Sequence, residues 1–167
     1  MPINTTTNPN VRIDASNAGV FSDAAYSAAG RSTAALGPNW HEDTSLSVAT
    51  ASNQMRAFVN DTTKQVVFAF KGTDNLSNGV SDIVDSGASA YLEIHDALNT
   101  SYSSATANYS GYQILTDGHS LGGGMSQSFA LEHGLNGYGQ NALPIASGTF
   151  SGITAFMGQN PTALVST

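Results

Sequence analysis

The stretch Tyr112–Gly134, YQILTDGHSLGGGMSQSFALEHG, decides the fold class of this chain. Its opening residues, Tyr112–Thr116, predict a short β-strand, and Leu121–His133 predicts a helix that ends where Gly134 can adopt a left-handed conformation. The segment that joins them includes Gly118–Gly123, which reads Gly-His-Ser-Leu-Gly-Gly and predicts a tight turn. A strand that passes through a tight turn directly into a helix is typical of α/β proteins.

The serine in this turn has glycines two residues before and two residues after it. That spacing, G-x-S-x-G, is typical of the nucleophile elbow of serine hydrolases, in which a strained turn at a helix N-terminus holds the serine Oγ exposed. We therefore predict that Ser120 is a nucleophile and that Gly118, His119 and Gly122 complete its elbow. The alternative is a glycine-rich helix start in which Ser120 only caps the helix.

A second set of candidate residues follows an apolar run that predicts a buried strand, Gln65–Phe70. The run leads into Gly72-Thr73, and the carboxyl end of such a strand would lie beside the elbow. A tetrahedral intermediate needs at least two donors aimed at its oxyanion. We predict that Thr73, through its backbone amide and hydroxyl, and Leu121, through its backbone amide, form this oxyanion hole. The alternative is an ordinary turn at a strand end.

The rest of the chain completes a single α/β domain with a flexible N-terminus over residues 1–13. Apolar periodicity and turn residues predict, in chain order, a helix from Asp14 or Ser16 to Gly30, a loop with a short strand over 31–50, a hairpin of Gln54–Asn60 and Gln65–Phe70, a helix over Tyr91–Ala107, and short strands at Ala142–Ile145 and Ile153–Met157.

Four motifs, in order along residues 55–134, resemble the class 3 lipases. They are the hairpin ending in Phe70-Lys71-Gly72-Thr73, the segment Asn78-Gly79-Val80-Ser81-Asp82-Ile83, the segment Ile94-His95-Asp96-Ala97-Leu98, and Gly118-His119-Ser120-Leu121-Gly122-Gly123. The resemblance implies an α/β-hydrolase fold, with a mostly parallel sheet flanked by helices. It also implies serine-dependent hydrolysis of acylglycerols and related esters without a cofactor.

The resemblance further implies a lid over the active site within residues 74–86. The apolar residues there fall near helical spacing: Leu76, Val80, Ile83 and Val84. Because the segment is otherwise polar, a small soluble ester competes with a lipid ester as the substrate, and an ordinary surface loop is the alternative to a lid. One departure from the family is Asp117, which stands where these lipases have Thr or another small residue. Its carboxylate would oppose an oxyanion unless it points away.

The residues that would activate Ser120 are missing from the expected places. A serine hydrolase needs a histidine base and an acid, which in this fold follow the serine. After Ser120 the only acid is Glu132 and the only histidine is His133. About twelve helical residues, or roughly 18 Å, separate both from Ser120, so we expect them to be surface residues at a helix end.

The three earlier histidines are not predicted to be the base either. By the resemblance His95 is structural, His119 should point away from Ser120, and His41 lies in a loop. The family's acid follows the serine by roughly 50 to 60 residues and its histidine by roughly 100 or more, whereas 47 residues follow Ser120. We expect either the N-terminal part of a longer lipase or a non-catalytic fragment or lipid-binding pseudo-hydrolase.

Composition excludes several other function classes. The net charge is −7 with only five Lys and Arg, so the chain lacks the basic face that nucleic acids and anionic membranes require. It has no Cys, which excludes thiol chemistry and Cys-ligated metals, and we predict no metal site. No apolar run approaches the about 18 residues of a membrane span. The N-terminus lacks a classical signal peptide, so we expect a soluble protein whose localisation, including signal-independent secretion, stays open.

Overall fold

The computed structural model describes residues 17–26, 33–73, 81–142 and 165–166. The predicted flexible N-terminus, residues 1–13, lies outside them. The elements are α1 (Ala18–Ala25), a 3-10 helix (Thr33–Leu36), β1 (Trp40–Glu42), β2 (Val48–Ala49), β3 (Gln54–Asn60), β4 (Gln65–Phe70), α2 (Ser81–Asn108), β5 (Gln113–His119), α3 (Leu121–His133), β6 (Asn136–Gln140) and β7 (Val165–Ser166).

These strands form one mixed sheet with the order β1-β3-β4-β5-β6-β7, and β2 pairs with β3 beside β1. The pairs β1–β3, β2–β3 and β3–β4 are antiparallel, whereas β4–β5, β5–β6 and β6–β7 are parallel. The α/β class is therefore confirmed, but the expectation of a mostly parallel sheet holds only from β4 onward. The reason is that the predicted hairpin β3–β4 and the two short strands before it all pair antiparallel.

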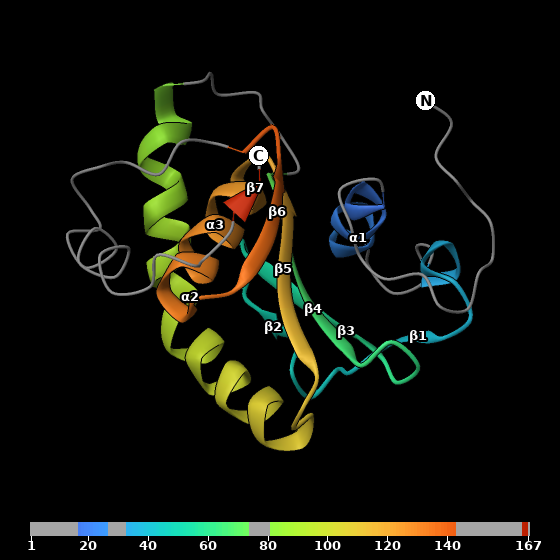
Figure 1. Cartoon of the computed structure of the whole chain (residues 1–167). Helices are drawn as coiled ribbons and strands as arrows, with labels where there is room; N and C mark the ends of the chain where they lie inside the picture. The colour runs from blue at the N-terminus through green and yellow to red at the C-terminus, as the bar shows by residue number, and fades with distance from the viewer. Residues whose placement is uncertain (1–16, 27–32, 74–80, 143–164, 167) are drawn as a thin grey trace.

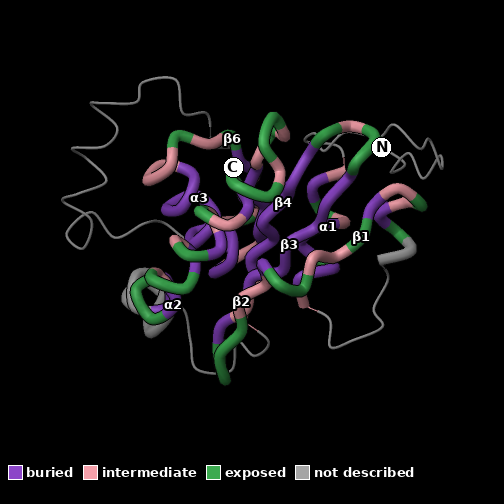
Figure 2. The backbone as a smooth tube through the Cα atoms, turned by 90° about the horizontal axis from the view of Figure 1, so that it is seen from below, coloured by how far each residue is buried: buried purple, intermediate pink, exposed green. Residues whose placement is uncertain are grey.

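Helices cover both faces of this sheet, with α2 and α3 on one face and α1 on the other (Figure 1). Strand β4 accounts for the arrangement because all six of its residues are buried. Val66, Phe68 and Phe70 pack in the core beneath α2 and α3. Val67 and Ala69 pack in the core beneath α1. Figure 2 shows the resulting run of buried backbone through the middle of the molecule.

The predicted hairpin and the helix after Ser120 have the bounds that the sequence indicated. β3 and β4 pair from Met55↔Phe70 to Asn60↔Gln65, around the turn 61–64, in which Lys64 has a φ of 55°. α3 ends at His133, and Gly134 follows with a φ of 65°. Local turn chemistry therefore sets both boundaries.

The remaining boundaries differ from the predictions, and α1, at Ala18–Ala25, lies inside the bounds predicted for it. β5 runs three residues beyond Thr116, since it is held between β4 and β6 as far as the pair His119↔Gln140. α2 begins at Ser81, ten residues before the predicted start. The segment 31–50 carries β1 and β2 in place of one short strand.

β6 was not predicted, because its sequence Asn-Gly-Tyr-Gly-Gln is unlike a typical strand. Gly137 faces Thr116 so closely that an added Cβ would overlap the threonine hydroxyl, and the glycine is therefore needed for β6 to pair with β5. Of the predicted strand Ala142–Ile145, Ala142 is not in a strand. The rest of it, and the whole of Ile153–Met157, lie outside the described residues.

Candidate functional site

Ser120 lies between the end of β5 and the first residue of α3 in a conformation that residues other than glycine rarely adopt. Its φ is 56° and its ψ is −121°. Such a backbone is strained for a residue with a Cβ and persists only where surrounding contacts hold it. Its side chain makes no capping hydrogen bond. The alternative of a helix-capping serine is therefore not supported.

Two glycines allow this turn to be tight. A Cβ at Gly118 would overlap the carbonyl oxygen of Gly122 and lie 2.8 Å from the nitrogen of Gly123. A Cβ at Gly122 would overlap the carbonyl oxygen of Phe70 and lie 2.7 Å from the carbonyl carbon of Lys71. These are backbone atoms that no side-chain rotation can move aside. The start of α3 therefore packs directly on the ends of β4 and β5.

The predicted oxyanion residues belong to this edge of the sheet. Leu121 is the first residue of α3 and is buried, and Thr73 is half-buried three residues after the end of β4. Phe70 and Gly118 are register partners in the parallel pair β4–β5, so both strands end at the same level. Parallel strands present their carboxyl ends on one side, which is where ligands bind in open α/β sheets.

A backbone hydrogen bond ties Ser120 to the neighbouring strand. Its amide donates to the carbonyl oxygen of Gln140, the last residue of β6, at 3.0 Å. Its own carbonyl accepts from the amide of Gly124 at 3.2 Å, which closes the first turn of α3. The position of Ser120 therefore depends on where β6 ends.

Asp117 points away from Ser120 and toward α1. Its Oδ2 lies 2.7 Å from Ser22 Oγ, and its Oδ1 accepts from Gln140 Nε2 at 2.9 Å. The residue is fully buried, and this burial raises the pKa of Asp117 to about 7, against the lowering effect of its hydrogen bonds. The carboxylate that the sequence placed near the oxyanion hole is therefore on the opposite face of the sheet.

His119 lies on the same side of the sheet as Asp117 and contacts the residue that follows α1. Its Nδ1 lies 3.2 Å from the hydroxyl of Tyr26. Both residues line a cavity of about 190 Å³ together with Gly19, Ser22, Asp23 and Gln140. No sequence pattern indicated this cavity, because α1 lies nearly a hundred residues before Ser120 in the chain.

Glu132 is engaged by α2 and does not reach Ser120. Its Oε1 lies 2.8 Å from His95 Nε2, and its Oε2 accepts from the hydroxyl of Tyr91 at 2.5 Å. These bonds and the charge of His95 lower the pKa of Glu132 against the opposing effect of burial. Glu132 therefore links α3 to α2, and the expectation that it is simply a surface residue is wrong.

His133 likewise is not simply a surface residue at a helix end. Its ring lies 4.2 Å from the ring of Tyr102 and 4.4 Å from the ring of Phe129, measured between centroids. Burial lowers its pKa, so the neutral imidazole is favoured. The fourth histidine, His41, lies in β1 and near Asp61. Among the described residues, no histidine or carboxylate is hydrogen-bonded to the Ser120 side chain.

The predicted lid falls mostly outside what the structure describes. Leu76 and Val80 are outside the described residues. Ile83 and Val84 belong to the first turn of α2, where only the backbone is described. The lid therefore stays a prediction.

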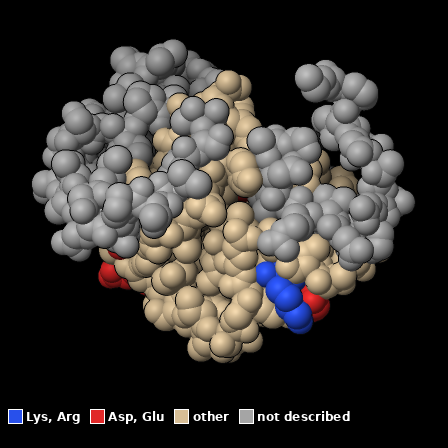
Figure 3. Space-filling view, viewed as in Figure 1, with Lys and Arg blue, Asp and Glu red and all other residues tan. Residues whose placement is uncertain are grey.

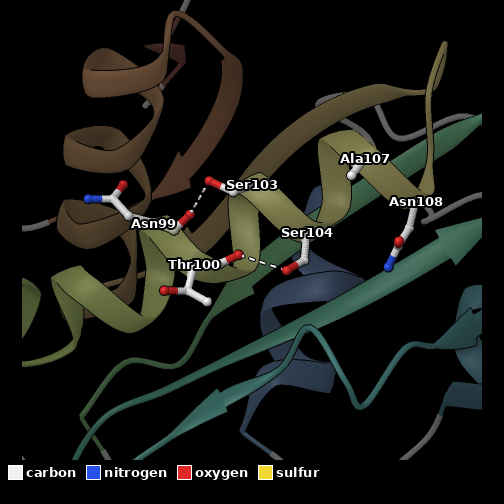
Figure 4. A pocket seen from close by; sticks show the side chains of 6 residues that line it. All are labelled: Asn99, Thr100, Ser103, Ser104, Ala107 and Asn108. Carbon is white, nitrogen blue, oxygen red and sulfur yellow. Dashed lines mark hydrogen bonds between the residues drawn. The ribbon is translucent and has the colours of Figure 1, made fainter.

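A larger hollow of about 590 Å³ follows the outer side of α2, lined by Asn99, Thr100, Ser103, Ser104, Ala107 and Asn108. The hydroxyls of Ser103 and Ser104 donate back to the helix carbonyls of Asn99 and Thr100, both at 2.9 Å (Figure 4). Their donors are therefore used within the helix. The lining has no charged, acidic or basic group that could take part in catalysis.

The described residues show neither a strongly charged surface on the face in Figure 3 nor a group of metal ligands. Charged side chains are sparse on the described surface of the face in Figure 3. In the part of the chain that the structure describes, no three His, Asp or Glu residues are grouped as metal ligands would be. No helix within the same ranges is both long and apolar enough to cross a membrane.

Comparison with known proteins relates this fold to fungal lipases. No model of a protein family matches the sequence, and no curated protein does. A triacylglycerol lipase from Penicillium expansum superposes with a TM-score of 0.65 at 17% identity, over 90% of this chain and 65% of that one.

Two further lipases are similar to the same extent. The Rhizomucor miehei lipase in its propeptide complex gives a TM-score of 0.62 at 16% identity, over 89% of this chain and 54% of that one. The lipase from Rhizopus microsporus var. chinensis gives 0.60 at 15% identity, over 82% and 63%. The chain thus has the fold of the class 3 lipases that its motifs resemble, and it spans between half and two-thirds of their length.

Proposed function

We propose that Ser120 is the nucleophile of a serine ester hydrolase. The observation that carries this proposal is the strained backbone of Ser120 at the junction of β5 and α3, held by backbone packing at Gly118 and Gly122. Strained backbone of this kind clusters at active sites and ligand-binding sites. The likeness of the fold to lipases supports the same conclusion.

In the proposed reaction, Ser120 Oγ attacks the carbonyl carbon of a carboxylic ester while a base takes its proton. The negative charge that develops on the carbonyl oxygen is stabilised by the amide of Leu121 and by Thr73. The ester oxygen then leaves with a proton as the alcohol, and the acyl group stays on Ser120. Water attacks this acyl-enzyme in the same way and releases the carboxylic acid.

None of the described residues is hydrogen-bonded to the Ser120 side chain as a base. All four histidines of the chain are described, and none is hydrogen-bonded to Ser120. The similar lipases are longer than this chain, so a longer form of the protein, or a partner chain, is the proposed source of the base and its acid. The substrate class is a lipid ester or a small soluble ester. Leu76, Val80, Ile83 and Val84 are the proposed lid.

The missing base also favours a second candidate function. A chain with this fold and no base could bind a lipid ester without cleaving it, as a lipid-binding pseudo-hydrolase. The two candidates differ in whether Ser120 forms a covalent bond.

Chemical rescue tests the choice on the chain as it stands. The chain is incubated with a fluorophosphonate probe, with and without free imidazole as a substitute base, beside Ser120→Ala. The control is Ser103→Ala, which removes an exposed hydroxyl bonded only within α2. We expect imidazole to speed labelling of the chain and of the control, but not of Ser120→Ala. Binding of a fatty-ester analogue without any Ser120-dependent labelling would contradict the hydrolase and support the pseudo-hydrolase.

A further inference from the structure

Three side chains from three different elements form a closed triangle behind Ser120. Ser22 of α1 lies 2.7 Å from Asp117 of β5, measured from Oγ to Oδ2. The same Oγ lies 2.5 Å from Gln140 Oε1 at the end of β6. Gln140 Nε2 closes the triangle at 2.9 Å from Asp117 Oδ1. Ser22 and Asp117 are buried, and Gln140 is partly buried.

The triangle requires one more proton than an ionised Asp117 can provide. Each of the three contacts has hydrogen-bond length, and each needs one hydrogen between its two heavy atoms. The hydroxyl of Ser22 supplies one and the amide of Gln140 supplies another. If the amide oxygen and nitrogen of Gln140 are exchanged, one of the three contacts still lacks a hydrogen, now the contact between Gln140 and Asp117. The carboxyl group of Asp117 is the one other group in the triangle that can carry the third hydrogen.

The surroundings of Asp117 favour this neutral acid. It is 0% exposed, and burial raises its pKa to about 7 although the backbone amides of Ser22 and Gly118 also donate to it. The titratable side chains around it are Asp23 of α1, Tyr26 directly after α1, Tyr138 of β6 and His119 of β5. Strand β4 presents Ala69 beside it. The nearest cation in its row of the sheet is Arg56 on β3, which is paired with Glu42.

The triangle is connected to Ser120 through a single residue. Gln140 joins the triangle through its side chain, and its backbone carbonyl accepts the amide of Ser120 at 3.0 Å. Asp117 itself is three residues before Ser120 in β5. The triangle therefore fixes the end of β6 against β5 at the point where β6 holds the strained turn.

We propose that Asp117 is a positioning residue, held as the neutral carboxylic acid in a ring of three hydrogen bonds with Ser22 and Gln140 that locks Ser120 in its strained conformation. The inference rests on the proposed function, because it assigns the ring to the reactivity of Ser120. Loss of the Asp117 proton removes one of the three bonds and leaves a buried carboxylate, so the ring opens and β6 loosens its hold. Ser120 is therefore held in its strained conformation at acidic to neutral pH, and this conformation is no longer held in alkaline solution.

Nuclear magnetic resonance tests the ring without any reaction of Ser120. The carboxyl ¹³C resonance of Asp117 is titrated in the 167-residue chain, and hydrogen exchange of the Ser120 amide is followed beside it. We expect a midpoint near pH 7 and a protection factor that falls about tenfold between pH 6 and pH 8. In Asp117→Asn, whose amide can fill the same three contacts, protection should not change with pH. Titration of Asp117 near pH 4, as in a solvated carboxyl, would overturn the ring.

Labelling of Ser120 by the fluorophosphonate, with imidazole present, tests whether the ring affects the reactivity of Ser120. Relative to Asp117→Asn, the wild-type rate should be equal at pH 6, about half at pH 7 and about a tenth at pH 8, following the protonated fraction of a group with a pKa of about 7. Asp117→Ala should be slow at every pH. The control Asp23→Asn changes an exposed neighbour and should keep the wild-type profile.

The two readouts distinguish the possible failures. If Asp117 titrates near pH 7 and no variant is ever labelled, the proposed function is wrong and the positioning role is wrong with it, although the ring itself stands. If labelling depends on Ser120 but its pH profile is the same in Asp117→Asn, the positioning role alone is wrong.

Discussion

Replacing Gly122 by alanine probes the packing that holds Ser120 in place. The new Cβ would overlap the carbonyl oxygen of Phe70 and lie 2.7 Å from the carbonyl carbon of Lys71. Alanine is favoured over glycine inside a helix by about 1 kcal/mol. Forcing an extra carbon into a packed interior costs about 1–3 kcal/mol, and the upper end applies here because backbone atoms of β4 must shift. We therefore expect Gly122→Ala to lower the free energy of unfolding by about 2 kcal/mol.

Gly19→Ala is the matched control. Gly19 is in the first turn of α1, is exposed, and has nothing within 4 Å of an added Cβ. The same substitution there should raise the free energy of unfolding by about 1 kcal/mol, the helix gain used for Gly122, so the two variants should differ by about 3 kcal/mol.

Urea unfolding followed by tryptophan fluorescence measures both variants. Trp40 is the only tryptophan, is 7% exposed, and packs edge-to-face against Phe21 with ring centroids 4.8 Å apart. Its emission should therefore report loss of the packing between α1 and the sheet. If Gly122→Ala proves as stable as Gly19→Ala, with an unchanged dependence on urea, then α3 does not press on the end of β4 and the reasoning about the turn fails.

Three further predictions concern stability in the same assay. Folding raises the pKa of Asp117 from 3.8 to about 7. Between pH 3.8 and pH 7 the folded chain therefore binds more protons than the unfolded chain. The free energy of unfolding should fall as the pH rises, by about 2.5 kcal/mol from pH 5 to pH 8. Asp117→Asn should lack this part of the slope, and an equal slope in both proteins would refute the assignment. Arg56→Met should cost about 3 kcal/mol, because it removes the guanidinium that donates to the largely buried Glu42 carboxylate and to the carbonyl of Ala24. A cost under about 1 kcal/mol would count against that ion pair. Phe129→Ala should cost about 4 kcal/mol, since the ring is fully buried beneath α2, and a neutral effect would mean that the core there is loosely packed.

The sequence predicted those parts of the fold that local chemistry controls. The turn 61–64 and the apolar runs on either side of it define the hairpin β3–β4, and Gly134 defines the end of α3. The sequence could not show that β5 continues to His119 or that the glycine-rich segment 136–140 is a strand. Both depend on pairing between distant segments, and Gly137 is required there only because Thr116 lies opposite it.

In the candidate site, too, the sequence predicted the local features and missed those that depend on distant segments. Ser120 and its flanking glycines form a local motif, and the sequence identified them without knowledge of the fold. The surroundings of Asp117 are not local, because Ser22 and Gln140 reach it from 95 residues before and 23 residues after. The sequence could therefore flag the carboxyl group as unusual, but not the hydrogen-bond ring that contains it.

Mass-spectrometric mapping of the fluorophosphonate adduct tests the central claim most directly. The chain is labelled in the presence of imidazole, digested, and the modified residue is located among its serines. We expect one adduct, on Ser120, that is absent from Ser120→Ala and weakened in Gly122→Ala. Adducts spread over exposed serines at equal rates, or no adduct on Ser120 under any condition, would contradict the claim that this strained serine is a nucleophile.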